Sequence, residues 1–282
     1  MSLQTQAMLV VLSVSGWGAR KQDKKVAAEV EASHNAHDAG EYRKRLIDKA
    51  HLEPLERFEG QVRKYHYKMT APWMDNGARI LPSKLSMEYF AEIRKLKIEQ
   101  AALVDTFVRV YETKLVQDAR VRLGTMYDPD DYPSGAEIRA KFGIDLDIQP
   151  VPDGHDFRVD VGDAERQRIA QDIIDKVAAR TATAQRDAWS RVRNAVSTIE
   201  SRLSVPKARI YDTLISNVED LARLLPGLNI SNDPLMDHVC TQITERLIVD
   251  PQRLRDSMTS RKRVADAARE ILDMVPHDVE MV

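Results

Sequence analysis

Two stretches of about 40 residues contain neither proline nor glycine, and they limit what this chain can fold into. They run over 83–123 and 163–203. In both, apolar side chains recur at the three- and four-residue spacing of a helix with one buried face. Helices this long exceed the usual globular length and favour pairing with each other. We therefore expect a mainly α protein, an elongated bundle built on two long antiparallel helices.

Shorter segments alternate apolar and polar residues, which is typical of strands with one buried face. The N-terminal segment near 7–15 is apolar, and the segments near 144–150 and 156–161 alternate with aspartates and an arginine. The last two are predicted to form a hairpin. An isolated hairpin is marginally stable, so the N-terminal strand is expected to join it. The sequence thus predicts a small three-stranded antiparallel β-sheet.

Residues 1–205 are predicted to form the long-helix scaffold with its sheet. Residues 206–282 are predicted to form a helical region packed on that scaffold, and the sequence leaves open whether they belong to the same domain. Prolines at helix-opening positions, including Pro206, Pro234 and Pro251, divide this region into short helices.

The chain has 282 residues and a formal net charge of −2, from 42 Lys+Arg and 44 Asp+Glu. This balance argues against coating of nucleic acid or membrane by charge alone. It hides an asymmetry, because residues 1–127 sum to +5 and residues 128–282 to −7. Two parts of opposite net charge favour head-to-tail contacts between copies of the chain. The basic groups form either a phosphate-contacting face or a solvated helix surface, and the candidates are Lys24, Lys25, Arg43, Lys44, Arg45, Arg63 and Lys64.

Compartment signals favour a soluble, intracellular protein. The single cysteine, Cys240, cannot form an intrachain disulfide. The apolar run at 7–12 is not preceded by Lys or Arg, so it lacks the basic start of a signal peptide. No segment approaches the length of a membrane span, and no membrane contact is expected.

Motifs for catalysis are absent from the sequence. It contains no Walker A loop, GxGxxG, HExxH, GxSxG or paired CxxC. Aspartates at 128–131 and 145–160 could hold metal for a nuclease, but Asp-Gly turn chemistry and polar strand faces explain them without metal. The sequence favours a non-enzymatic protein without catalytic residues, metal or cofactor.

Two loops carry tryptophan and arginine, residues that are enriched at binding hot spots. One follows the N-terminal strand and the other joins two predicted helices. These residues either bind a partner or close the end of the bundle. The candidate partner-binding residues are Trp17, Arg20, Lys21, Trp73, Asn76 and Arg79.

Four segments together resemble an uncharacterised family of tailed-bacteriophage and prophage proteins of unknown function. They are VSGWGARKQDKKVAAEV, HYKMTAPWMDNGARILPS, YDPDDYPSGAEIRAKFG and PVPDGHDFRVDVGDAE. The resemblance covers most of the chain from about residue 9 to 165, and the family has no assigned catalytic residues. It implies a viral origin and a place in the host bacterial cytoplasm. Members of this family are encoded near AAA+ ATPases of the chelatase-like type. The resemblance therefore implies such an ATPase as a partner.

Three functions follow, in descending order of support from the sequence. The first is a non-enzymatic, oligomerising protein that binds itself and a phage or host protein. The second is a nucleic-acid-binding accessory protein in phage replication or recombination. The third is a metal-dependent nuclease or an accessory subunit of an AAA+ ATPase.

Overall fold

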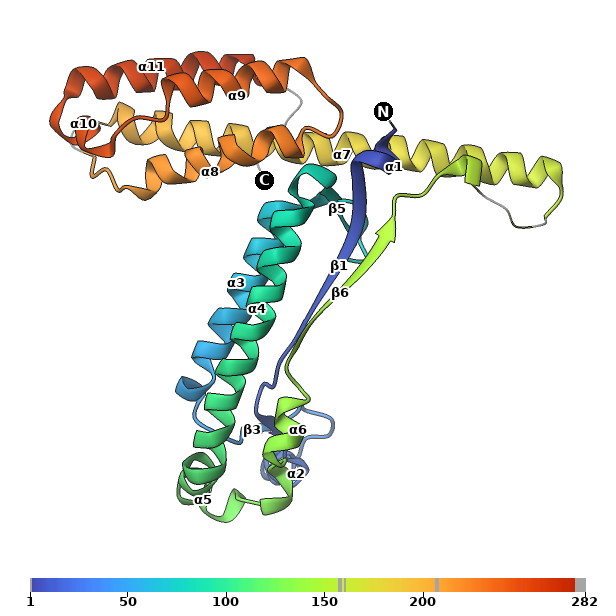
Figure 1. The fold of residues 1–282 in the computed structure, drawn as a ribbon. Helices are drawn as coiled ribbons and strands as arrows, with labels where there is room; N and C mark the ends of the chain where they lie inside the picture. Colours follow the sequence, from blue (N-terminus) through green and yellow to red (C-terminus); the bar gives the residue numbers. More distant parts are fainter. Residues whose placement is uncertain (1, 157–158, 160, 206–207, 277–282) are drawn as a thin grey trace. The chain divides into compact units, whose positions relative to one another are not determined.

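Helices dominate the structure, a computed structural model that describes residues 2–156, 159, 161–205 and 208–276 (Figure 1). The predicted mainly helical class with a small sheet is confirmed. The chain forms two units. The first comprises Met1–Val11, Tyr67–Tyr89 and Asp147–Val282, and the second comprises Leu12–His66 and Phe90–Leu146.

The first unit contains a helical bundle. The long helix α7 (Asp163–Ser204) packs against α8 (Thr213–Leu228) and α11 (Met258–Met274), while α9 (Pro234–Arg246) packs against both α8 and α11. These contacts close a ring of four helices, as in a four-helix bundle. The short α10 (Pro251–Asp256) packs on α11. Buried side chains from all four helices, such as Val196, Val218, Ile243 and Ile271, form its core.

Two of the three proline signals in this region place helix starts correctly, since Pro234 and Pro251 open α9 and α10. The third, Pro206, lies outside the described residues, and α8 begins only at Thr213. Asp233 and Asp250 each precede a proline and accept a hydrogen bond from the backbone two residues on. Ser257 likewise caps α11 by accepting from the Ser260 amide. These caps satisfy amide groups that the first helical turn leaves without a partner. The local sequence thus determines where the short helices begin.

The main sheet has four strands, so the predicted three-stranded sheet is wrong in its number of strands. The strands are β1 (Ala7–Ser15), β4 (Ala71–Pro72), β5 (Arg79–Pro82) and β6 (Gly143–Pro150), in the order β4-β5-β1-β6. β5 pairs antiparallel with both β1 and β4. β6 therefore borders β1 and does not depend on a hairpin partner (Figure 1).

The two unpredicted strands of the main sheet come from a segment interpreted as a loop. β4 and β5 are short and each ends in proline, so they show no apolar–polar alternation. The turn between them holds Gly77 at a φ of +91°, which favours glycine. The predicted strand near 156–161 includes residues 157, 158 and 160, which lie outside the described residues. Its described members are not in a strand, and 154–156 form the 3₁₀ turn η5.

The second unit has its own hydrophobic core. Its helices are α2 (Lys24–His34), most of α3 (Glu53–Met69), most of α4 (Ser83–Val110), α5 (Val116–Leu123) and α6 (Gly135–Arg139). A separate two-stranded ribbon is formed by β2 (Arg20–Gln22) and β3 (Arg43–Arg45). The core includes Leu46, Leu55, Val108, Tyr111 and Ile138.

Both long helical runs exist, but their predicted antiparallel pairing is wrong. The first run is α4, a π-helical turn at Tyr111–Leu115 and α5, and the second is α7. α7 packs on α8 and α11 of its own unit, whereas most of α4 belongs to the second unit. An apolar face shows that a helix needs a partner, but its spacing does not identify that partner.

Within the described part of the chain, every helix is too short or too polar to cross a bilayer.

Candidate functional site

The two loop tryptophans contribute to cores. Trp17 is half-buried in the second unit and packs edge-on against Tyr111 and Phe107, at centroid distances of 5.5 and 6.3 Å. Trp73 is buried in the first unit with Leu9, Ile80 and other apolar residues. Both indole rings are therefore occupied by contacts inside their units.

The other residues of the second loop have local structural roles. The Asn76 carboxamide accepts a hydrogen bond from the Ala78 amide within the β4–β5 turn. Arg79 donates to the hydroxyl and carbonyl of Thr70 and lies over the Tyr67 ring at 4.8 Å. Burial is the first cause of a lowered pKa for Arg79. Asn76 itself remains exposed.

Sequence reasoning missed a second arginine beside Arg79. Arg191, on α7, donates to the carbonyl oxygens of Tyr67, Lys68 and Thr70 and pairs with Asp187 at 2.8 Å. These carbonyls lie at the C-terminal end of α3, where a cation is favoured by the unpaired carbonyl groups. No local signal distinguishes this arginine from the others on α7, because its partners are distant in the chain.

The two halves of α7 have different surroundings. All eight buried residues of this 42-residue helix lie between Ala184 and Leu203. None of residues 163–183 is buried. This exposed half nevertheless carries an apolar row, in which Ile169, Ile173 and Val177 are half-buried and Ile174 is 36% exposed.

A hollow of about 810 Å³ lies beside the exposed half of α7. Ile174, Val177 and Thr181 form one wall, and Leu3 and Ile230 contribute other parts. The η5 turn rests directly on the helix, because a Cβ added at Gly154 would lie 2.4 Å from the carbonyl oxygen of Ala170. Among the described residues, this turn packs near the middle of the exposed half of α7, and Val177 packs against the core cluster that includes Leu9 and Ile230.

The structure brings most of the predicted basic residues together on the β2–β3 ribbon. Arg20, Lys21, Arg43, Lys44 and Arg45 are in its two strands, and the exposed Lys24 and Lys25 open α2 directly afterwards. Arg63 and Lys64 are on α3 instead. Arg63 donates to the carbonyl oxygen of Val14, and Lys64 is exposed.

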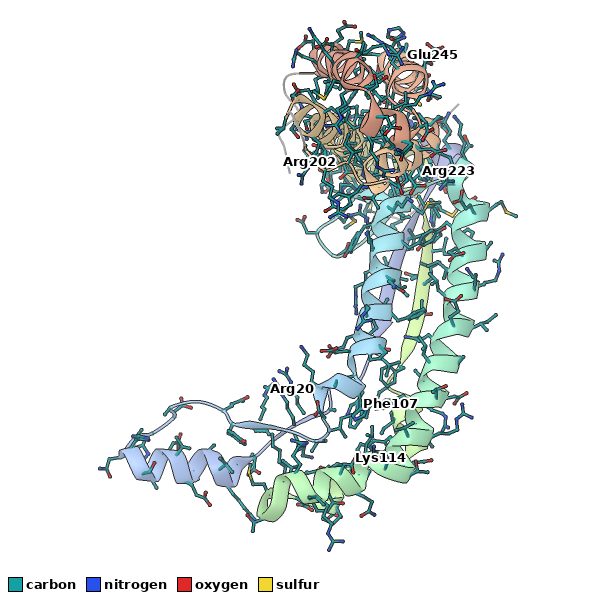
Figure 2. All side chains as sticks on the ribbon, turned by 90° about the vertical axis from the view of Figure 1, so that its left-hand side faces the viewer. Arg20, Phe107, Lys114, Arg202, Arg223 and Glu245 are labelled. Carbon is teal, nitrogen blue, oxygen red and sulfur yellow. The ribbon has the colours of Figure 1, made fainter. Side chains whose placement is uncertain are left out.

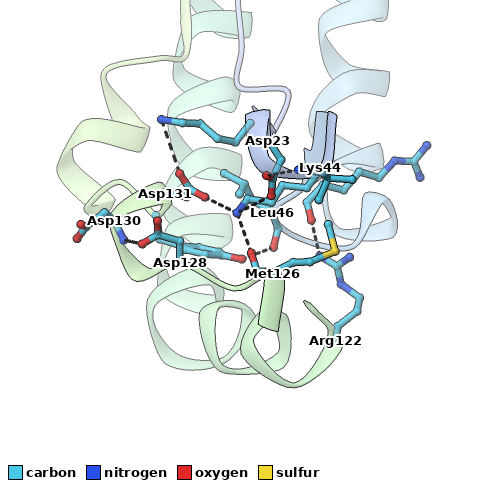
Figure 3. Close-up of polar contacts among 12 residues, drawn as sticks. Asp23, Lys44, Leu46, Arg122, Met126, Asp128, Asp130 and Asp131 are labelled. Atoms are coloured by element: carbon cyan, nitrogen blue, oxygen red, sulfur yellow. Dashed lines mark hydrogen bonds and ion pairs between the residues drawn. The ribbon is translucent and has the colours of Figure 1, made fainter. Parts of the chain in front are cut away.

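Lys44 is a buried member of this group (Figure 3). Its ammonium group lies 2.8 Å from Asp131 and 3.4 Å from Asp23, and it donates to the Met126 carbonyl at 2.7 Å. Burial alone would lower the pKa of Lys44, but the hydrogen bonds and charges of Asp131 and Asp23 raise it above its ordinary value. Lys44 therefore fixes the ribbon to the acidic turn formed by residues 128–131.

The aspartates of that turn are engaged in local contacts. Asp128 accepts from the Asp130 amide, and Asp131 pairs with Lys44 and also with Lys21 at 3.7 Å (Figure 3). Among the residues that the structure describes, no group of three or more His, Cys, Asp or Glu side chains could hold a metal ion. Asp131 therefore holds the ribbon, whereas Asp128 stabilises the turn itself.

Comparison of the chain with protein-family models, with curated proteins and with solved structures gives no match.

Proposed function

We propose that this protein is a non-enzymatic interaction protein that self-associates through the exposed half of α7, residues 163–183. The observation that carries the proposal is the contrast within one helix. Its C-terminal half has eight buried residues, and its N-terminal half has none. Most helical stability in proteins comes from packing of an apolar face, so a further partner on this half would stabilise it.

The charges of the exposed half suit a second copy of the same chain. This half contains four acidic and four basic residues, so two copies do not repel each other through net charge. Its acids and bases are also interspersed. The acidic residues are Asp163, Glu165, Asp172 and Asp175, and the basic residues are Arg166, Arg168, Lys176 and Arg180.

An antiparallel arrangement centred between residues 171 and 172 places Ile173 of one copy level with Ala170 of the other. Ile169 of one copy is then level with Ile174 of the other, and Asp163 is level with Arg180. Such a contact is isologous, because the same surface is used by both copies, and it closes as a dimer. It adds apolar contact between partly exposed side chains, which is the main favourable contribution to association.

Light scattering on two matched variants tests this proposal. Ile173→Asp places a charge in the apolar row, whereas Ala179→Asp places the same charge about 120° away around the helix. We expect the wild-type protein and the Ala179→Asp variant to exceed the 32.0 kDa of one chain, and the Ile173→Asp variant to return to that mass. Equal masses for the two variants would contradict the assignment of the surface.

A phage origin, a host-cytoplasmic location and an AAA+ ATPase partner remain part of the proposal. Their support is the sequence resemblance. Mixing the protein with a phage AAA+ ATPase of the chelatase-like type would test the partner, since a true accessory changes the ATPase's turnover.

A further inference from the structure

The register of the β2–β3 ribbon places like charges opposite each other. Arg20 pairs with Arg45, and Lys21 pairs with Lys44. Like charges directly opposite on antiparallel strands are destabilising. The third pair is Gln22 with Arg43, so five of the six strand residues are basic. Such a ribbon needs nearby negative charge to offset the repulsion.

The two faces of the ribbon differ in how that charge is supplied. Residues directly opposite in a strand pair share a face, and successive residues alternate between faces. Lys21 and Lys44 share the face that Asp131 neutralises (Figure 3). The opposite face carries Arg20, Arg43 and Arg45, all of them exposed.

The arginine face has little compensation within the chain. Glu41 pairs with Arg43 at 2.8 Å, where both side chains are more than half exposed. In the part of the chain that the structure describes, the guanidinium groups of Arg20 and Arg45 have neither a hydrogen bond nor an ion pair. Figure 2 shows the Arg20 side chain on the β2–β3 ribbon. Arg122 adds another guanidinium nearby, because it donates to the Arg45 carbonyl at 2.7 Å.

Several hydrogen bonds attach the ribbon to neighbouring segments of the second unit. Besides the Lys44 contacts, the Leu46 amide donates to the Ala19 carbonyl and the Tyr132 hydroxyl donates to the Leu46 carbonyl. The Asp23 amide donates to the Tyr42 carbonyl at the other end of the ribbon. A two-stranded ribbon alone is marginally stable, so these contacts fix the arginine face toward the exterior.

We propose that the arginine face of this ribbon, formed by Arg20, Arg43 and Arg45, binds the phosphodiester backbone of a nucleic acid. Guanidinium groups make paired hydrogen bonds with phosphate oxygens and are weakly hydrated, which suits them to this ligand. A two-stranded ribbon also fits the major groove of duplex DNA. This inference is independent of self-association through α7.

Fluorescence anisotropy with a labelled 20-nucleotide duplex and a labelled single strand tests the proposal. The test variant is Arg20→Gln/Arg43→Gln/Arg45→Gln. The control is Arg94→Gln/Lys97→Gln/Lys114→Gln, which removes the same charge from exposed positions of the same unit. For each phosphate contact, the logarithm of the duplex affinity falls by about 0.9 when the salt concentration rises tenfold. Between about 50 and 200 mM salt, the duplex affinity of the test variant should therefore fall about 40-fold less than that of the wild type, because three phosphate contacts are missing.

The control variant should keep the wild-type salt dependence. Binding of either nucleic acid with this difference supports the proposal, and the two arms identify whether duplex or single strand is preferred. Failure of the wild-type protein to bind both at about 50 mM salt, or an equal loss in the two triple variants, would overturn it. These results leave the mass predicted for self-association unaffected, so the two proposals can fail separately.

Folding of the variants is checked by thermal unfolding. Removing the arginines relieves the repulsion between opposite residues, so the midpoint of the test variant should equal or exceed that of the wild type. If the triple variant does not fold, Arg20→Gln alone tests the same contact, with an expected reduction of about 1 in the salt slope. An unchanged slope in a folded Arg20→Gln variant would contradict the role of Arg20.

Discussion

The ammonium group of Lys44 lies 2.8 Å from the carboxylate of Asp131, and this buried ion pair joins β3 to the acidic turn before α6. The side chains are only 7% and 11% exposed. The pair explains how a ribbon with opposed basic residues is held. It also gives Asp131 a structural role within the aspartate-rich turn.

Replacing Lys44 with methionine should lower the free energy of unfolding by about 2 kcal/mol, because Asp131 loses its closest cation and keeps only Lys21, at 3.7 Å. Urea denaturation measures the change. Lys25→Met, at an exposed position of α2, is the matched control and should change stability by less than about 0.5 kcal/mol. Similar losses in the two variants would show that the ion pair does not stabilise the fold.

The pH dependence of stability should reflect Asp23. The hydrogen bond from the Val26 amide is the first cause of its lowered pKa, and Lys44 lowers it further. A carboxyl whose pKa is lower in the folded state stabilises the fold above its unfolded pKa. That stabilisation is lost as the pH falls through the lower, folded value. We therefore expect Asp23 to contribute stability at pH 7 that disappears at pH values below its ordinary 3.8.

Asp23→Asn isolates this effect, because asparagine also caps helices well and keeps the cap of α2. The variant should be less stable than the wild type at pH 7 and equal to it near pH 2, as measured by urea denaturation at each pH. A constant difference between the two proteins across this range would argue against titration of Asp23 as the cause.

Two glycine-to-alanine changes should have opposite effects. At Gly154 a Cβ would collide with the backbone of Ala170, so alanine should destabilise the contact between η5 and α7. At Gly60, within α3, a Cβ meets nothing within 4 Å, and alanine should raise the free energy of unfolding by about 1 kcal/mol through helix propensity. Thermal unfolding of both variants checks the prediction, and a stabilising Gly154→Ala would contradict the close approach.

Arg191 should not be replaceable by lysine. Its guanidinium reaches three carbonyl oxygens near the end of α3, and the fixed fork of donors makes this possible. We expect Arg191→Lys to reduce the free energy of unfolding by about 1–2 kcal/mol. Arg186→Lys, at an exposed position on the same helix, should have little effect. Equal stability of Arg191→Lys and the wild type would show that the three contacts contribute little.

Local patterns predicted the elements of this fold better than their partners. The long run without proline or glycine identifies α7, and Asp-Pro pairs locate the starts of α9 and α10. The same patterns did not show that α7 packs on α8 and α11, because periodicity describes a face without naming what covers it. β4 and β5 were missed because strands this short have no periodicity.

The candidate sites show the same division between local and distant information. Arg43, Lys44 and Arg45 look equivalent in sequence, yet only the middle residue is buried. Alternation along β3 could have suggested two faces, but the partner that selects the buried face, Asp131, lies far along the chain. The exposed half of α7 carries the same apolar spacing as the buried half, so only the structure separates them.

Sedimentation equilibrium of the wild-type protein over a wide concentration range tests self-association most directly. We expect the mean mass to rise with concentration from the 32.0 kDa of one chain toward twice that value, and Ile173→Asp to abolish the rise. A wild-type mass that remains at 32.0 kDa at every concentration would contradict self-association through α7.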